Sequence, residues 1–216
     1  MRESETISGC LDPFIRKLPA LDMGWQMIEN CARQGFGLPG TGSMDYEDYI
    51  NSYQQFEEWL SSLVEDEPLP KPIVALHFGV FESEDGLELY IAGSDECSDI
   101  RTGDWAHEVD FFPQGRFASL DVYRDLSALR EENEDAAIAL ALALPIVYCA
   151  QFCASEQNVD QLLRRKGLFS SRRDSLLLGT GLDEDEELYY PFAHLTAEGL
   201  RPLAAEELEE LLEDED

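Results

Sequence analysis

Basic residues are scarce in this chain, which carries 15 lysines and arginines against 46 acidic residues over 216 positions, for a formal net charge of −31. The deficit runs along the whole chain: residues 1–70 hold 4 basic and 13 acidic residues, residues 71–135 hold 5 and 16, and residues 136–216 hold 6 and 17. A field of this sign repels nucleic acid and anionic membranes, and it speeds association with a basic partner by roughly 10–1,000-fold. We therefore expect a protein partner with a basic surface, and neither nucleic-acid nor membrane binding.

We expect no export signal, and the cysteines show no Cys-x-x-Cys pair. The first residues of the chain, MRESETISGC, contain no apolar signal core. The cysteines are odd in number and form no Cys-x-x-Cys motif; they are Cys10, Cys31, Cys97, Cys149 and Cys153. We expect a cytoplasmic protein with five reduced thiols.

Motifs for catalysis and for cofactors are missing as well. The sequence has no Gly-x-Ser-x-Gly, no His-Glu-x-x-His and no cysteine close to a histidine. Cys149 and Cys153 share a helical face and would supply half of a metal site, but no histidine stands at ligand spacing, so two structural thiols are favoured. We expect no catalytic residues, no cofactor and no metal. The alternative is a small cytoplasmic hydrolase that uses His107 and nearby carboxylates.

Hydrophobic periodicity indicates an α+β fold, with an antiparallel sheet and helices packed on it. Residues 73–81 are rich in β-branched and aromatic residues and residues 87–92 alternate apolar with polar ones, so the turn-like stretch between them predicts a hairpin. Pro13 and Pro19 predict an irregular lead-in at residues 11–20. The expected helices are residues 22–34, 45–64, 119–132, 159–166 and a short one at 204–216, with further strands at 176–178 and 187–192.

The longest apolar run, residues 136–154 (AAIALALALPIVYCAQFCA), raises the question of a membrane span. Its length without a formal charge is marginally sufficient for one. Its many alanines, Pro145 in the middle and the acidic residues before it favour a helix buried in a soluble core instead. We expect this buried Ala/Leu-rich helix to be part of the fold.

These elements fit one acidic domain over residues 1–216, or a helical part, 1–66, joined by a proline-rich linker to an α+β part, 70–216. A single basic concentration interrupts the acidity, formed by Arg164, Arg165, Lys166, Arg172 and Arg173. Pairing of these side chains with the protein's own acidic surface is favoured over a site for an anion or RNA, because the surrounding field is strongly negative.

The segment after the predicted hairpin gathers carboxylates around one large aromatic residue. The candidate partner-binding residues are Asp95, Glu96, Asp99, Asp104, Trp105, Glu108 and Asp110. In one interpretation the carboxylates meet the lysines and arginines of a partner, and the tryptophan is the anchor. In a second, hard oxygen ligands hold a divalent cation, although the spacing departs from a calcium loop. In a third, the loop is only solvated and the tryptophan lies in the core.

The run LYIAGSDECSDIRTGDWAHEVDFFPQGRF, residues 89–117, resembles a pattern of small acidic bacterial immunity proteins: Leu-Tyr-x-x-Gly-Ser, an acidic stretch, Asp-Trp-Ala and Pro-x-x-Arg. Cys97 and Arg101 interrupt the acidity that this pattern leads us to expect. Immunity proteins are encoded beside toxins delivered between competing bacteria and span many folds, so the resemblance implies a role and not an architecture.

The resemblance and the charge together predict an immunity protein that binds and neutralises a cognate toxin, a basic nuclease. A cleft built to attract phosphates also attracts carboxylates, which makes a strongly acidic inhibitor suitable for such a toxin. An acidic adaptor or nucleic-acid mimic without a dedicated toxin is the other alternative to the hydrolase. If the segment around Asp95 to Asp110 is only a solvated surface, the acidic loop at residues 183–187 is the next candidate for the interface.

Overall fold

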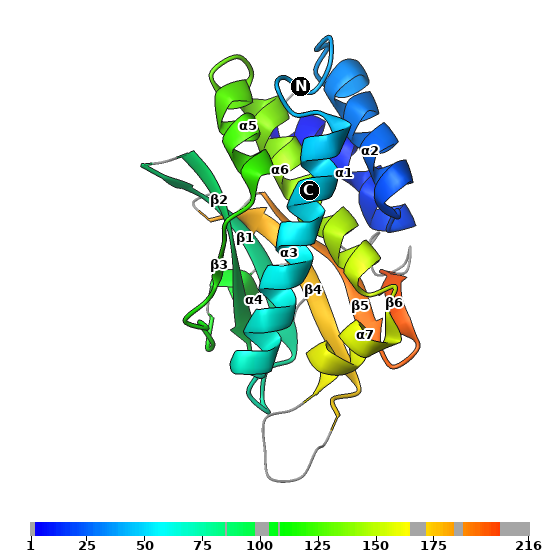
Figure 1. Cartoon of the computed structure of the whole chain (residues 1–216), viewed down its shortest axis with the longest axis vertical. Helices are drawn as coiled ribbons and strands as arrows, with labels where there is room; N and C mark the ends of the chain where they lie inside the picture. The colour runs from blue at the N-terminus through cyan, green and yellow to red at the C-terminus, as the bar shows by residue number, and fades with distance from the viewer. Residues whose placement is uncertain are drawn as a thin grey trace, which may run out of the picture.

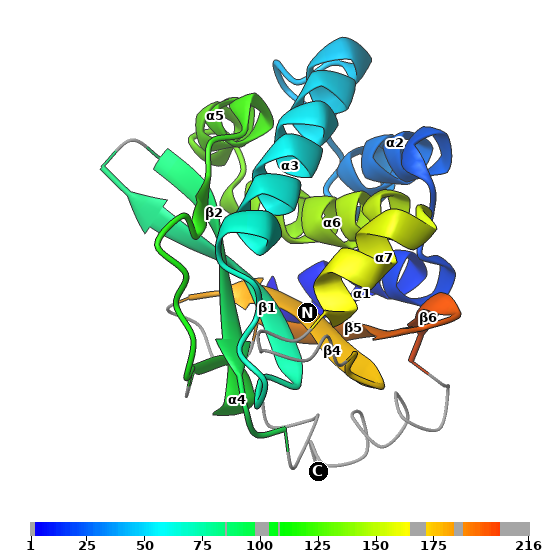
Figure 2. The same ribbon diagram turned by 60° about the horizontal axis from the view of Figure 1, so that its bottom comes forward.

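The computed structural model describes residues 3–84, 86–97, 104–107, 109–164, 172–183 and 188–203. A layer of helices covers one face of a six-stranded sheet (Figures 1 and 2). The elements in chain order are α1 (Glu3–Lys17), α2 (Leu21–Asn30), the π-helical turn η1 (Cys31–Gly35), α3 (Tyr46–Asp66), β1 (Ala75–Ser83), β2 (Gly86–Ser94), α4 (Asp104–His107), β3 (Phe117–Ala118), α5 (Asp121–Arg130), α6 (Glu134–Phe152), α7 (Glu156–Leu163), β4 (Ser175–Leu182), β5 (Tyr189–Thr196) and β6 (Gly199–Pro202). The expected α+β fold is confirmed.

The strand order is β3-β2-β1-β4-β5-β6, and every neighbouring pair is antiparallel except β1 and β4. The predicted hairpin is confirmed, with Ser83 opposite Gly86 at its turn. β1 and β4 run parallel, with Ala75 opposite Leu177. Parallel neighbours need a long crossover connection, and here the chain between them supplies α5, α6 and α7. The sheet is therefore mixed, where the sequence predicted only antiparallel pairs.

Helix α6 is buried on all sides, as the Ala/Leu-rich sequence predicted. Every residue from 136 to 149 is buried, against α1, α2, α3 and α5 and against strands β1 and β4. Among the described residues, α6 is the one helix long and apolar enough to cross a membrane, and 83% of its most apolar window is buried inside the protein. Burial of this extent is typical of the core helix of a soluble protein.

A proline inside α6 is accommodated by a neighbouring tyrosine. Pro145 has no N–H, so the carbonyl of Ala141 loses its intrahelical donor. The hydroxyl of Tyr123, from α5, donates a hydrogen bond of 2.9 Å to that carbonyl. Both residues are fully or almost fully buried, so the bond satisfies a polar group that water does not reach. At the start of the helix, the side chain of Asn133 accepts from the N–H of Ala136 at 2.9 Å and caps it.

The aromatic stripe of α3 forms part of the core. Asp45 caps this helix in a capping box with Asp48. Inward-facing side chains recur every three or four residues, and those that are buried are Tyr49, Tyr53, Phe56, Leu60 and Leu63. They pack on α6, where the hydroxyl of Tyr148 donates to the carbonyl of Tyr49 at 2.9 Å. One hydrophobic core draws on both the N-terminal helices and the sheet.

The expectation of an irregular lead-in at residues 11–20 was wrong, because α1 is helical from Glu3 to Lys17 with Pro13 inside it. Its apolar face, made of Ile7, Leu11, Phe14 and Ile15, is buried against α6 and η1. Four such side chains stabilise the helix by roughly 1.5–3 kcal/mol each, which outweighs a cost of about 3 kcal/mol for an internal proline. Proline weighed too heavily in the prediction. The next expected helix, 22–34, is α2 followed by η1, and Ala20 rather than Asp22 is its N-cap.

The described part of the basic cluster binds the protein itself. Arg173 is buried, and its guanidinium donates to the carbonyls of Leu162 at 2.8 Å and Pro70 at 2.9 Å. Arg172 pairs with Asp160 at 2.8 Å. The pair of Arg172 with Asp160 is the acidic pairing that the sequence favoured, whereas Arg173 binds backbone carbonyls. Arg165 and Lys166 lie outside the described residues, as does the expected helix at 204–216.

Candidate partner-binding site

Two of the predicted carboxylates, Asp95 and Asp110, meet where β2 ends. The N–H of Asp110 donates to the carbonyl of Gly93 at 3.0 Å, and a carboxylate oxygen of Asp110 accepts from the N–H of Asp95 at 3.0 Å. Both residues are exposed. The charge of Asp110, and then a hydrogen bond to its carboxylate, raise the pKa of Asp95 above its ordinary value. The backbone thus holds two like charges together at the surface, an arrangement that a cation would stabilise.

The other predicted site residues are divided between the surface, the core and the undescribed part of the chain. Glu96 is exposed beside this pair and contributes to the raised pKa of Asp95. Asp99 and Glu108 lie outside the described residues. Asp104 and His107 lie in α4, but nothing is described of their side chains. Most of the acidic loop at 183–187 is likewise outside the described part of the chain.

Trp105 lies in the protein's own core, which settles one of the open interpretations against the anchor. Only 5% of Trp105 is exposed, and its ring packs edge-on against Tyr189 with 5.0 Å between centroids. The hydroxyl of Ser94 donates to the carbonyl of Trp105 and fastens α4 to β2. A buried ring on its own sheet does not offer a partner the exposed aromatic surface that an anchor needs, so its assignment as a partner-binding residue is corrected.

Trp105 belongs to an aromatic layer on the face of the sheet opposite the main helix layer. His77 lies between the rings of Tyr90 and Tyr189, with centroids 5.9 Å and 5.6 Å away. Glycine provides the room: a Cβ at Gly179 would lie 2.4 Å from the hydroxyl of Tyr189 and 3.1 Å from the ring of Trp105. His77 is buried.

The polar ends of this layer differ: Tyr90 is hydrogen-bonded within the protein, whereas the hydroxyl of Tyr189 and the indole nitrogen of Trp105 are buried without a hydrogen-bond partner among the described residues. The hydroxyl of Tyr90 donates to the carboxylate of Asp183, and burial, followed by that hydrogen bond, raises the pKa of Tyr90. Burial also raises the pKa of Tyr189. Both phenols therefore stay protonated at neutral pH, and we assign the layer to packing.

A second acidic surface was not predicted. Between the turn of the β1–β2 hairpin and the end of α5 lies a hollow of about 550 Å³, which we call the acidic groove. Its lining residues are Glu82, Ser83, Glu84, Gly86, Leu87, Ser127, Ala128, Arg130, Glu131 and Glu134. Four of them are carboxylates and one is a cation. The four-residue spacing of Arg130 and Glu134 indicates one ion pair, here across the turn between α5 and α6, but only the packing of the hairpin on α5 brings Glu82 and Glu84 beside it.

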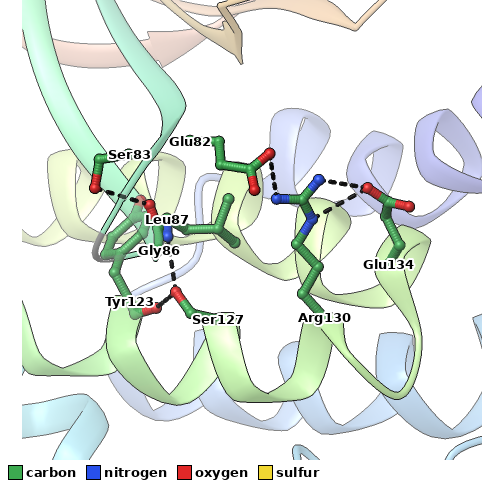
Figure 3. A network of polar contacts seen from close by, with 8 residues as sticks. All are labelled: Glu82, Ser83, Gly86, Leu87, Tyr123, Ser127, Arg130 and Glu134. Carbon is green, nitrogen blue, oxygen red and sulfur yellow. Dashed lines mark hydrogen bonds and ion pairs between the residues drawn. The ribbon is translucent and has the colours of Figure 1, made fainter.

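Arg130 joins the two sides of the acidic groove (Figure 3). Its guanidinium pairs with Glu82 of the hairpin at 2.6 Å and with Glu134 of α6 at 2.6 Å. Hydrogen bonds to these two carboxylates raise the pKa of Arg130, and this effect is larger than the lowering caused by burial. Glu84 and Glu131, the remaining acidic residues of the lining, are exposed, so the groove keeps an excess of negative charge.

Ser127 fixes the hairpin turn against α5. Its hydroxyl accepts from the N–H of Leu87 at 2.7 Å and donates to the carbonyl of Tyr123 at 2.7 Å (Figure 3). Gly86 has a φ of 117°, which favours glycine, and a Cβ there would lie 2.3 Å from the hydroxyl of Ser127. The hairpin end of the groove is therefore held in one position.

Among the described residues, no group of three histidine, cysteine or acidic side chains is placed to hold a metal ion. The side chains of Asp99 and Asp104, two candidate cation ligands, lie outside the described part of the structure. No protein-family model, curated protein sequence or solved structure matches the chain.

Proposed function

We propose that this chain is a non-enzymatic immunity protein that binds the basic surface of a cognate toxin, a nuclease, in the cytoplasm and blocks it. The observation that carries the proposal is the pair of exposed carboxylates Asp95 and Asp110, which the backbone holds in contact despite their repulsion. A guanidinium or ammonium group of a partner placed between them would remove this repulsion and gain two charge-assisted hydrogen bonds.

The distribution of charge supports the same function. The net charge of −31 attracts a basic protein from a distance, and the paired carboxylates and the acidic groove provide local positions for its cations. Long-range attraction acts mainly on the association rate, whereas close contacts act on the dissociation rate. With Trp105 in the core, the anchors of such an interface are carboxylates and not this aromatic side chain.

Two measurements test this function. Cells that express the toxin encoded in the neighbouring reading frame should survive when they also express this chain and die when they do not. The purified chain should bind that toxin and inhibit its nuclease activity, while an unrelated basic nuclease is bound much more weakly. Equal binding to both nucleases would instead favour an acidic mimic of nucleic acid, and failure to protect the cells would contradict the immunity function.

A further inference from the structure

Two cysteines that are distant in the sequence are neighbours in the structure. Cys10 lies in α1 and Cys31 opens the π-helical turn η1, and these two elements pack together. Each thiol shifts the pKa of the other through a hydrogen-bond contact. Cys10 is partly exposed, whereas Cys31 is buried. The pair thus has one partly exposed member and one buried member.

The π-helical turn makes the space that the pair occupies. Gly35 closes this turn, and a Cβ on it would lie 2.4 Å from the sulfur of Cys10. Any larger residue at this position would push the thiol of Cys10 aside. Single π-helical turns occur often at functional positions, and this one begins at Cys31 and brings Gly35 close to the sulfur of Cys10.

The hydrogen bond divides the chemistry between the two thiols. By donating to Cys10, Cys31 lowers the pKa of the Cys10 thiol, against a smaller opposing effect of burial. The same bond, together with burial, raises the pKa of Cys31. Cys10 therefore carries the larger share of thiolate, the nucleophilic form, and Cys31 keeps its proton.

The chain contains a second pair of thiols that serves as a natural comparison. Cys149 and Cys153 lie four residues apart at the end of α6, and both are buried. Burial raises the pKa of each, to about 12 for Cys153 and well above the ordinary value for Cys149. These two thiols are close together but remain protonated and shielded from solvent.

We propose that Cys10 and Cys31 form a peroxide-sensitive modification site, in which Cys10 is oxidised first and Cys31 then closes a disulfide. The Cys10 thiolate attacks one oxygen of hydrogen peroxide, the O–O bond breaks, and Cys10 becomes a sulfenic acid as hydroxide leaves and is protonated to water. The sulfur of Cys31 next attacks the sulfur of Cys10, the S–O bond breaks, and the proton of Cys31 leaves with that oxygen as a second water. Hydrogen peroxide is uncharged, so the strongly acidic surface does not repel it.

The reduced, full-length protein treated with hydrogen peroxide tests this site directly. Samples are alkylated at intervals and digested without reductant, and the peptides are identified by mass spectrometry. We expect an intramolecular link between Cys10 and Cys31 to form several-fold faster than any oxidation of Cys149, Cys153 or Cys97. Oxidation of Cys149 and Cys153 at the same rate as Cys10 would overturn the proposal.

Variants of Cys31 separate its two roles. C31S keeps a hydrogen-bond donor beside Cys10 and removes the second thiol, so a sulfenic acid should accumulate on Cys10 and react with dimedone. C31A removes both the donor and the thiol, so labelling of Cys10 by dimedone should be several-fold slower than in C31S. Thermal unfolding of each variant checks that the fold is retained. Equal labelling rates in C31S and C31A, both folded, would show that Cys31 does not activate Cys10 and would overturn the assignment. In C10S, a disulfide between Cys31 and any other cysteine that forms as fast as the link in the wild type would overturn it as well.

Discussion

The hydrogen bond from Tyr123 to Ala141 makes a sharp prediction about how α6 tolerates its proline. Tyr123→Phe removes the hydroxyl and leaves the carbonyl of Ala141 buried without a donor, because Pro145 has no N–H to replace it. The loss of one such bond costs about 1–3 kcal/mol. For a chain of this size each kcal/mol lowers the melting temperature by roughly 2–4 °C. We expect Tyr123→Phe to lower the free energy of unfolding, measured by urea titration, by about 1–3 kcal/mol.

A double-mutant cycle isolates the cause. Pro145→Ala restores an N–H that can donate to the carbonyl of Ala141 within the helix, so Tyr123→Phe should cost less in this background. We expect a coupling energy of about 1–2 kcal/mol, within the range measured for contacting residues. The matched control is Tyr53→Phe, whose hydroxyl binds Glu57 at a partly exposed position and should cost ~0.5 kcal/mol or less in both backgrounds. If Tyr123→Phe costs the same with and without Pro145, compensation for the proline is not the role of this hydroxyl.

Three further predictions concern the candidate site and the aromatic layer. The double variant D95N/D110N should bind a basic toxin more slowly at low salt and also dissociate from it faster. The control E65Q/D66N, which removes the same charge from the exposed end of α3, should change only the association rate. Equal effects of the two variants in stopped-flow or surface binding would show that the paired carboxylates are not in the interface. The pKa of Asp95 in the folded protein is raised above 3.8, so the folded state keeps a proton that the unfolded state releases, and the stability contributed by this group falls as pH rises above that value. Urea titrations at several pH values should show this fall in the free energy of unfolding for the wild type but not for D110N. The same dependence on pH in both proteins would contradict the prediction. Gly179→Ala should destabilise the protein by about 1–3 kcal/mol through overpacking against Tyr189 and Trp105, and an unchanged melting temperature would show that the aromatic layer adjusts freely.

The sequence predicted the elements whose signal is local. The hairpin of β1 and β2, the capped helix α3 and the buried helix α6 each carry a complete pattern of spacing, caps and turn residues within one segment. The parallel pairing of β1 with β4 depends on residues about a hundred positions apart, such as Ala75 and Leu177, and no local pattern contains it. Helix α1 was missed because the interior proline obscured an apolar face that only α6 completes.

The candidate site was predicted in part for the same reason. Asp95 and Asp110 belong to one acidic segment, so the sequence placed both in the same region of the chain. Their contact depends on the bridge between Gly93 and Phe111, which returns the chain to β2. The acidic groove was not predictable, because Glu82 and Arg130 come from different elements and meet only when the hairpin packs on α5. One interpretation of the sequence placed Trp105 at the surface, because the segment around it is polar. Nothing in that segment indicates the space beside Gly179 that accepts its ring.

The parallel pair of β1 and β4 also governs the order in which the chain acquires its structure during synthesis. The β1–β2 hairpin and the helices have local contacts and form early, but the centre of the sheet closes only after β4 has left the ribosome. Until then the edge of β1 that pairs with β4 is open, and part of the apolar surface of α6 lacks its final cover. Helix α1 packs on α6 and β5, which lie far after it in the sequence, so it too waits for its partners. A strongly and evenly acidic chain has an advantage in this interval, because mutual repulsion keeps incomplete copies apart while their hydrophobic surfaces are still exposed.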